Sequence, residues 1–226
     1  MEHIGKVLQN LSPGQITPGP KIIEPEPVEL SPEEKREELR KSLGVSSLEN
    51  TFENFKPVPG TEKALAAFKA IASGQTDWKM LLVYGGVGNG KTHLCEATAI
   101  ALYKRGLFCR VLTMDRIMWA LKECIGSDSH ISLEELQRNY CYAERLILDD
   151  VTGTEWEFEQ LEKIIRARYR EHLFTILTSN LDIKPDPKNP SRPFISERIV
   201  SRFRDPDIAM LILNQGADYR RLKGGS

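Results

Sequence analysis

The sequence predicts an α/β fold in which a parallel sheet is flanked by helices. Short apolar runs of strand length alternate along the chain with longer segments of helical spacing, and this alternation is typical of a parallel sheet. The run Met80 to Tyr84 is continuously apolar, as in a strand buried on both faces. A glycine-rich loop separates this run from a helical segment. This part of the chain is therefore expected to form a strand, a loop and a helix in succession.

The other elements are expected in a regular order after residue 61. A helix begins near Thr61 and ends at Gly74, where its pattern of apolar residues stops. Further strands are expected at residues 110–113, 145–149, 174–178 and 210–213. Further helices are expected at residues 92–105, 115–125, 132–140, 155–171 and 196–203. The length of the chain suits a sheet of four or five strands.

The first part of the chain differs in composition from the rest. Six of the thirteen prolines fall in residues 13–32, which indicates an extended, flexible tether. A capping box, Ser31 to Glu34, then predicts a short charged helix that runs to about Ser42. This helix is either a solvated linker or a docking element for a partner. We therefore expect an N-terminal extension and linker over residues 1–50 and a globular domain over residues 51–226.

The charge balance excludes a whole-protein attraction to nucleic acid or to acidic membranes. The chain has 31 basic and 32 acidic residues, so any DNA contact has to come from a local patch. No stretch approaches the roughly 18 apolar residues of a membrane span, and the cysteines form no C-x-x-C pair. We expect a soluble, cytoplasmic protein with reduced, buried cysteines and no membrane partner.

The segment Gly85 to Thr92 carries the strongest chemical signal. It has the pattern G-x-x-x-x-G-K-T, in which glycines let backbone N–H groups point at phosphate oxygens and the following helix adds its positive dipole. Lys91 is expected to reach the β and γ phosphates, and the hydroxyl of Thr92 to ligate Mg²⁺. The expected cofactors are ATP and Mg²⁺. The expected ATP-binding residues here are Gly85, Gly86, Val87, Gly88, Asn89, Gly90, Lys91, Thr92 and His93.

Polar residues follow two further strands. Asp149 and Asp150 end the apolar run that starts at Leu146, and Asn180 follows the next strand. Parallel strands bring their carboxyl ends to one edge of the sheet, where open α/β folds bind ligands. We expect Asp149 to hold Mg²⁺ and Asp150 to orient or polarise the attacking water. Asn180 is expected to hydrogen-bond the γ-phosphate and that water.

Arg198 and Arg202 are four residues apart and therefore on one face of an expected helix. Exposed arginines on a helix are often only solvated. A phosphoryl group in transfer nevertheless needs added positive charge, and in oligomeric ATPases a neighbouring subunit often supplies it. The candidate catalytic residues are Lys91, Asp149, Asp150, Asn180, Arg202 and Arg198.

Four segments, in this order, resemble the Walker A, Walker B, sensor 1 and arginine-finger motifs of an AAA+ ATPase. They are Gly85 to Thr92, Leu146 to Asp150, Thr178 to Asn180, and Glu197 to Phe203. Among AAA+ ATPases, this sequence is similar to the bacterial helicase loaders of the DnaC/DnaI type, which are paralogues of the initiator DnaA. Three further segments share this resemblance: Thr51 to Phe55, Arg168 with Tyr169, and Asp218 to Arg220. The resemblance covers roughly residues 51 to 221.

The resemblance implies an AAA+ P-loop NTPase with a five-stranded parallel sheet of order 5-1-4-3-2 and a truncated lid. It implies ATP bound between self-associated subunits of an open or spiral oligomer, and slow ATP hydrolysis stimulated by DNA or a partner. The implied partners are the replicative DNA helicase and single-stranded DNA, so the implied function is helicase loading in DNA replication. Arg202 best matches the arginine finger, with Arg198 as the alternative, and Arg220 is the candidate for sensor 2 and a further ATP-binding residue.

In this family the DNA contacts lie between the second strand and the Walker B strand, here residues 113–140. The cations and stacking rings of this region would suit a single strand. They are Arg116, Trp119, Lys122, His130, Arg138 and Tyr140. Ile117, Met118 and Leu121 recur at helical spacing, which indicates that much of this region is core instead.

Two alternative functions remain open. A transposition helper ATPase of the IstB type has the same motifs but acts on duplex DNA with a transposase. The other is an ATP-binding scaffold that scarcely hydrolyses, because Asp150 stands where vigorous AAA+ motors have a longer glutamate. Residues 197–203 and the linker at residues 51–55 favour the loader.

Overall fold

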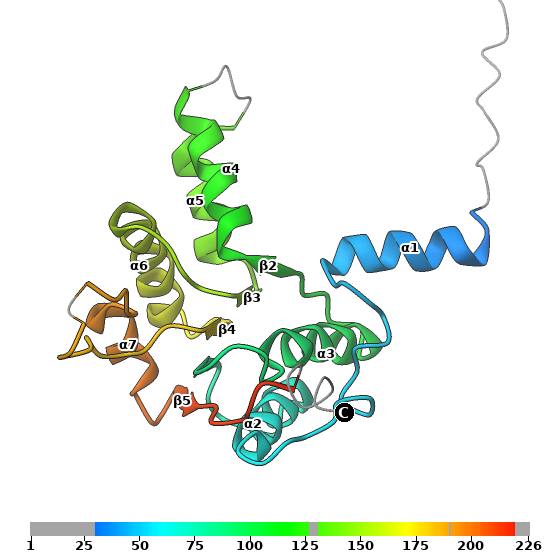
Figure 1. The fold of residues 1–226 in the computed structure, drawn as a ribbon. Coiled ribbons are helices and arrows are strands. Elements are labelled where there is room, and N and C mark those ends of the chain that lie inside the picture. Colours follow the sequence, from blue (N-terminus) through cyan, green and yellow to red (C-terminus); the bar gives the residue numbers. More distant parts are fainter. Residues whose placement is uncertain (1–29, 127–130, 190, 220–226) are drawn as a thin grey trace, which may run out of the picture. The chain divides into compact units, whose positions relative to one another are not determined.

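The structure is a computed structural model and describes residues 30–126, 131–189 and 191–219. Five strands and seven helices alternate along these residues (Figure 1). The strands are β1 (Met80–Tyr84), β2 (Val111–Thr113), β3 (Arg145–Asp149), β4 (Phe174–Ser179) and β5 (Ala209–Leu213). The helices are α1 (Pro32–Leu43), α2 (Glu62–Ser73), α3 (Lys91–Lys104), α4 (Met114–Gly126), α5 (Leu133–Tyr142), α6 (Glu155–Arg170) and α7 (Glu197–Phe203).

The strands form one sheet of order β2-β3-β4-β1-β5, and every pairing is parallel. Read from β5, this is the order 5-1-4-3-2, so the expected α/β fold is confirmed. Within it, Met80 of β1 pairs with Thr175 of β4 and with Ala209 of β5. β1 and β3 have the bounds predicted from their apolar runs, whereas most other elements begin or end one or two residues away, as is common at frayed ends.

Two hydrophobic clusters cover the two faces of the sheet. Met80 and Leu82 of β1 belong to the cluster that includes residues of α4, α5, α6 and α7. Leu81 and Val83 belong to the cluster that includes residues of α2 and α3. All four side chains are fully buried. Alternate residues of a strand point to opposite faces, so burial on both faces explains why β1 is apolar throughout.

The packed core reaches back before residue 51. One compact unit begins at Arg36, and Leu43 and Val45 are buried in the cluster that contains α2 and α3. These two apolar residues stand in a largely polar segment. A periodic pattern needs several apolar residues, so two of them gave no signal of a core contact.

A capping box starts α1, as the sequence predicts. The N–H of Ser31 donates to Glu34 Oε2 (2.8 Å), and the N–H of Glu34 donates to Ser31 Oγ (3.3 Å). After the last helical residue, Gly44 has a φ of +69°, a conformation that glycine adopts readily and that ends helices. The predicted proline-rich tether falls mainly on residues 1–29, outside the part of the chain that the structure describes.

The buried Arg168 joins α6 to its neighbours. Its guanidinium donates to Thr175 Oγ1 (2.9 Å) and to the carbonyl oxygens of Tyr140 (2.8 Å), Ala143 (2.7 Å) and Phe174 (2.7 Å). Burial lowers the pKa of Arg168 to about 10. These acceptors lie in the first two residues of β4 and at the end of α5, so the side chain ties α6, which carries Arg168, to both of these elements. It is a structural residue of the fold.

None of the four cysteines forms a disulfide. Cys95, Cys109 and Cys141 are buried, as expected, whereas Cys124 is partly exposed. Among the described residues, no helix is both long and apolar enough to span a bilayer.

Candidate nucleotide-binding site

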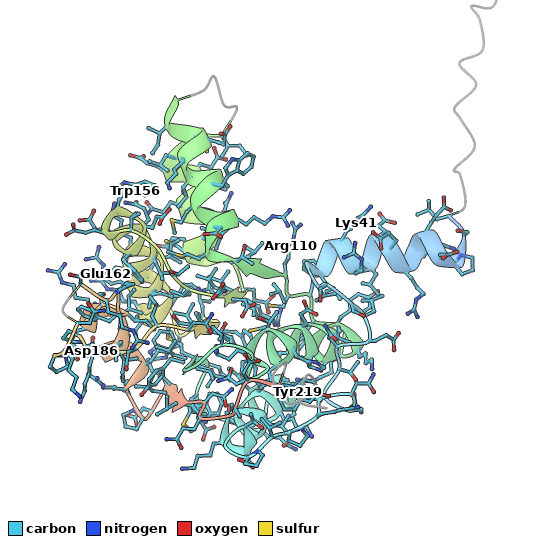
Figure 2. The ribbon with its side chains drawn as sticks, in the orientation of Figure 1. Lys41, Arg110, Trp156, Glu162, Asp186 and Tyr219 are labelled. Carbon is cyan, nitrogen blue, oxygen red and sulfur yellow. The ribbon has the colours of Figure 1, made fainter. Side chains whose placement is uncertain are left out.

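A cavity of about 650 Å³ opens where β1, β3 and β4 end. Its walls come from the phosphate loop, from the ends of β3 and β4, from the segment before α2 and from the segment after β5, which carries Tyr219 (Figure 2). The lining residues are Asn50, Asn54, Phe55, Lys56, Val58, Val87, Gly88, Asn89, Gly90, Lys91, Thr92, His93, Asp149, Asp150, Thr178, Asn180 and Tyr219. The structure therefore brings together the loop, both aspartates and Asn180.

Two glycines of the phosphate loop are required by their surroundings. Gly85 has a φ of +133°, and a Cβ there would collide with the carbonyl oxygen of Asn214. Gly90 has a φ of +87°, and a Cβ there would collide with the ring of Phe55. Both conformations favour glycine strongly. Because Gly90 is also the N-cap of α3, no side chain occupies the first N–H groups of the helix, which remain able to receive an anion.

The ammonium group of Lys91 is held inside the loop. Lys91 Nζ donates to the carbonyl oxygens of Gly85 (2.8 Å) and Gly86 (2.6 Å) and to Asn89 Oδ1 (2.9 Å). Burial lowers the pKa of Lys91 to about 8, although the charges of Asp149 and Asp150 oppose this shift. These three hydrogen bonds fix the position of the ammonium group. Gly85 and Gly86 act here through backbone oxygens, and neither lines the cavity.

The two aspartates at the end of β3 have different surroundings. Asp149 is 4% exposed and accepts hydrogen bonds at Oδ1 from Thr178 Oγ1 and from Cys95 Sγ, the latter at 3.7 Å. Burial and the charge of Asp149 raise the pKa of the Cys95 thiol, which keeps that thiol protonated. Asp150 is exposed, has a φ of +55° and accepts from Asn180 Nδ2 at 2.7 Å. An enclosed and a solvated carboxylate therefore stand side by side.

The segment before α2 forms one wall of the cavity, and His93 holds it. His93 Nε2 lies 2.8 Å from the carbonyl oxygen of Thr51, so this nitrogen carries the proton in that contact. The ring of His93 meets the ring of Phe55 edge to face, with centroids 5.2 Å apart. His93 does line the cavity, but its polar contact is with the wall.

Glu96, one helical turn after His93 in α3, also holds this wall. Its carboxylate is 3% exposed and accepts from the N–H of Ser46 (2.8 Å), from Ser46 Oγ (3.1 Å) and from Asn50 Nδ2 (2.6 Å). Sequence reasoning missed Glu96 and the lining residues Asn50, Asn54, Lys56 and Val58. The available signal is the segment at residues 51–55, which carries part of the resemblance to the AAA+ family.

The two arginines of α7 lie away from the cavity. Arg202 lines a separate cavity of about 320 Å³ together with Arg166, Tyr169, Arg170 and Ser201. Its guanidinium donates to the carbonyl oxygen of Arg198. The side chain of Arg198 is 79% exposed and stands 3.6 Å from Glu162, which is labelled in Figure 2. Arg220 lies outside the described residues.

The candidate DNA-contacting residues of α4 and α5 differ in how exposed they are. Arg116, Lys122, Arg138 and Trp119 are exposed, Trp119 by 65%, and Tyr140 is half-buried. Lys122 is already engaged, because it pairs with Glu157 at 2.6 Å and lies 5.6 Å from the ring centroid of Trp156. The apolar residues Ile117, Met118 and Leu121 belong to the core. His130 lies outside the described residues.

Comparison with known proteins identifies relatives of this fold. The family described as the bacterial DnaA ATPase domain matches residues 47–203. The chromosomal replication initiator protein DnaA of Citrifermentans bemidjiense is 30% identical over 157 residues, which are 68% of this chain and 33% of that protein. This chain therefore spans about a third of the length of that relative.

Solved structures agree with this match. The replication initiator DnaA bound to AMPPCP and single-stranded DNA has a TM-score of 0.59 and 27% identity, over 77% of this chain and 52% of that chain. The DnaC helicase loader has a TM-score of 0.57 and 22% identity, over 74% of this chain and 97% of that chain. At this identity, the likeness to the loader concerns the fold alone.

Proposed function

Because the chain belongs to the family of bacterial DnaA ATPase domains, we propose that it is an ATPase whose nucleotide state controls the loading of a replicative DNA helicase onto single-stranded DNA. One observation carries this proposal. The phosphate loop, the two aspartates at the end of β3 and Asn180 after β4 share one cavity. A solved DnaA relative binds AMPPCP and single-stranded DNA, which supports both ligands here.

In the proposed complex, Lys91 contacts the β and γ phosphates, and the N–H groups at the start of α3 receive phosphate oxygens. Thr92 and Asp149 would hold Mg²⁺, because both line the cavity and both offer the oxygen ligands that magnesium prefers. When bound, the metal would neutralise part of the phosphate charge. The hydroxyl of Thr178 donates to the buried carboxylate of Asp149 and so orients it.

Hydrolysis is proposed to depend on Asp150 and Asn180. Asp150 is the exposed carboxylate, so it can accept a hydrogen bond from the attacking water and orient it. The amide of Asn180 already donates to Asp150, which fixes the carboxylate. An amide also carries no charge at any pH. Asparagine therefore suits a place between the γ-phosphate and that water.

The rest of the site is proposed to come from a neighbouring copy of the chain. Arg202 is the proposed finger, with Arg198 as the alternative, since neither lines the cavity of its own subunit. An arginine supplied in this way stabilises the charge of the transition state. ATP would then join subunits as well as serve as a substrate. The proposed DNA-contacting region remains residues 113–140.

The test is ATP turnover by the full chain alone, with single-stranded DNA and with duplex DNA of equal length. We expect slow turnover that single strands stimulate. Stimulation by duplex alone would favour the transposition-helper alternative instead. Binding without turnover under every condition would favour the scaffold alternative, for which Asp150 in place of a glutamate is the motivating observation. Capture of a replicative helicase by the chain would separate a loader from both.

A further inference from the structure

Asn89 lies between the lysine of the phosphate loop and the chain segment after β5. Its Oδ1 accepts from Lys91 Nζ (2.9 Å), and its Nδ2 donates to the carbonyl oxygen of Asn214 (3.0 Å). In return, Nδ2 of Asn214 donates to the carbonyl oxygen of Asn89 (3.2 Å). Both residues are almost fully buried, at 2% and 1% exposed. The pair is therefore a reciprocal link between two distant parts of the sequence.

The segment at residues 214–219 follows the phosphate loop closely. The N–H of Asn214 donates to the carbonyl oxygen of Tyr84 (2.7 Å), and the N–H of Tyr219 donates to that of Gly88 (3.0 Å). The N–H of Gly216 donates to Asn214 Oδ1 (3.3 Å), so the same amide that binds Asn89 also shapes the segment. Tyr219 then reaches the cavity wall.

We propose that Asn89 is a positioning residue that couples phosphate binding at Lys91 to the placement of residues 214–219. The inference rests on the proposed nucleotide binding. An ammonium group has three N–H donors, and in this structure Lys91 has three acceptors: two loop carbonyls and Asn89 Oδ1. A phosphate oxygen can bind Lys91 Nζ only by replacing one of them.

Asn89 Oδ1 is the acceptor that the phosphate oxygen replaces. The other two acceptors are backbone carbonyls, fixed by the tight course of the loop, whereas a side-chain amide turns about its own torsions. When the amide turns, its Nδ2 no longer points at the carbonyl oxygen of Asn214. Phosphate binding thereby loosens residues 214–219. Coupling between two sites is reciprocal, so loosening this segment must strengthen phosphate binding.

The test is a calorimetric titration of AMPPCP with Mg²⁺ into the full chain and its variants. Asn214→Ala removes the amide that donates to the carbonyl oxygen of Asn89 and accepts from the N–H of Gly216. This change loosens residues 214–219, so we expect AMPPCP to bind about fivefold more tightly. Asn89→Ala removes the acceptor that competes for Lys91 and gives a similar gain. The double variant gains no more than either single change, because the coupling needs both hydrogen bonds of the reciprocal pair and each single change already removes one of them. Gln215→Ala, an exposed side chain of the same segment, leaves the affinity unchanged.

Unchanged or weaker binding by Asn214→Ala overturns the coupling, as does a full effect that persists when Asn89→Ala is also present. If the variants do not fold, hydrogen exchange of the wild-type chain decides. Residues 214–219 are expected to exchange faster when AMPPCP is bound, and equal or slower exchange overturns the coupling. A wild-type chain that binds no AMPPCP overturns the proposed function itself, so the two failures are distinguishable.

Discussion

The hydroxyl of Thr178 connects the two aspartates at the end of β3. Thr178 Oγ1 donates to Asp149 Oδ1 and accepts from the N–H of Asp150 at 3.1 Å. One hydroxyl thus holds the buried carboxylate and the backbone from which the exposed carboxylate projects. Since Thr178 belongs to the neighbouring strand β4, the spacing between the proposed metal-binding and water-orienting groups depends on the pairing of β3 with β4.

Replacing Thr178 is therefore expected to impair hydrolysis. Thr178→Val keeps the shape of the side chain but leaves a carboxylate oxygen and an N–H without this partner. A hydrogen bond to a charged group contributes about 1.5–3 kcal/mol, so we expect turnover to fall by about tenfold or more. Phosphate release measured over a range of Mg²⁺ concentrations checks this. Thr178→Ser retains the hydroxyl and should retain most activity, and a fully active Thr178→Val would contradict the assigned role.

Nucleotide affinity is expected to depend on pH through Lys91. Only the protonated ammonium attracts phosphate, and its pKa of about 8 lies well below the ordinary value of a lysine. Below this pH the group is charged and affinity is flat. Above it affinity falls, by up to about tenfold per pH unit. Titrations of AMPPCP between neutral and alkaline pH check the slope. Lys91→Met has no group to titrate and should bind weakly at every pH, so an equal slope in that variant would contradict the assignment.

Glu96 is expected to stabilise the cavity wall. Glu96→Gln keeps the size of the side chain but turns one acceptor into a donor that faces the donors of Ser46 and Asn50. Losing such a buried contact costs about 1–3 kcal/mol, so the free energy of unfolding should fall by this amount. Urea denaturation measures it. Glu159→Gln, at an exposed position of α6, is the matched control, and equal stability of both variants would show that the wall does not depend on Glu96.

Arg202 is expected to act between subunits. Arg202→Ala should bind ATP normally yet hydrolyse about 10³-fold more slowly, the lower end of the effect of an arginine finger. Mixing it with Lys91→Ala should restore part of the activity, because each mixed interface then pairs one intact loop with one intact Arg202. Arg204→Ala, at the end of the same helix, is the control. No recovery in mixed oligomers of confirmed size would argue against a shared site.

Local patterns predicted most of this fold because the physics behind them is local. β1 and β3 are buried runs bounded by a glycine loop and by aspartates, so their limits could be placed to the residue. α2 ends at Gly74, whose left-handed conformation allows its N–H to bond back to the helix. The phosphate loop has a pattern that specifies its own backbone. In such segments, neighbours in the sequence supply most of the constraint.

Long-range contacts were not predictable in the same way. Asn89 and Asn214 are 125 residues apart, and Glu96 and Ser46 are 50 apart. An asparagine in a loop or a glutamate on a helix is ordinarily solvated, and nothing in the local pattern distinguishes these buried examples. The role of Thr178 was missed for a related reason, because its partners belong to another strand. Such residues become visible only when the sheet places them together.

The most direct test of the account is the binding of Mg-ATP by Lys91→Ala. The central claim is that the ammonium group of Lys91, which donates to Gly85, Gly86 and Asn89, exchanges one of these acceptors for a phosphate oxygen of ATP. Titration of a fluorescent ATP analogue into the wild-type chain and the variant measures this exchange. We predict tight binding by the wild-type chain and at least about tenfold weaker binding by Lys91→Ala, as for loss of a charged hydrogen bond. Equal affinities would contradict the claim.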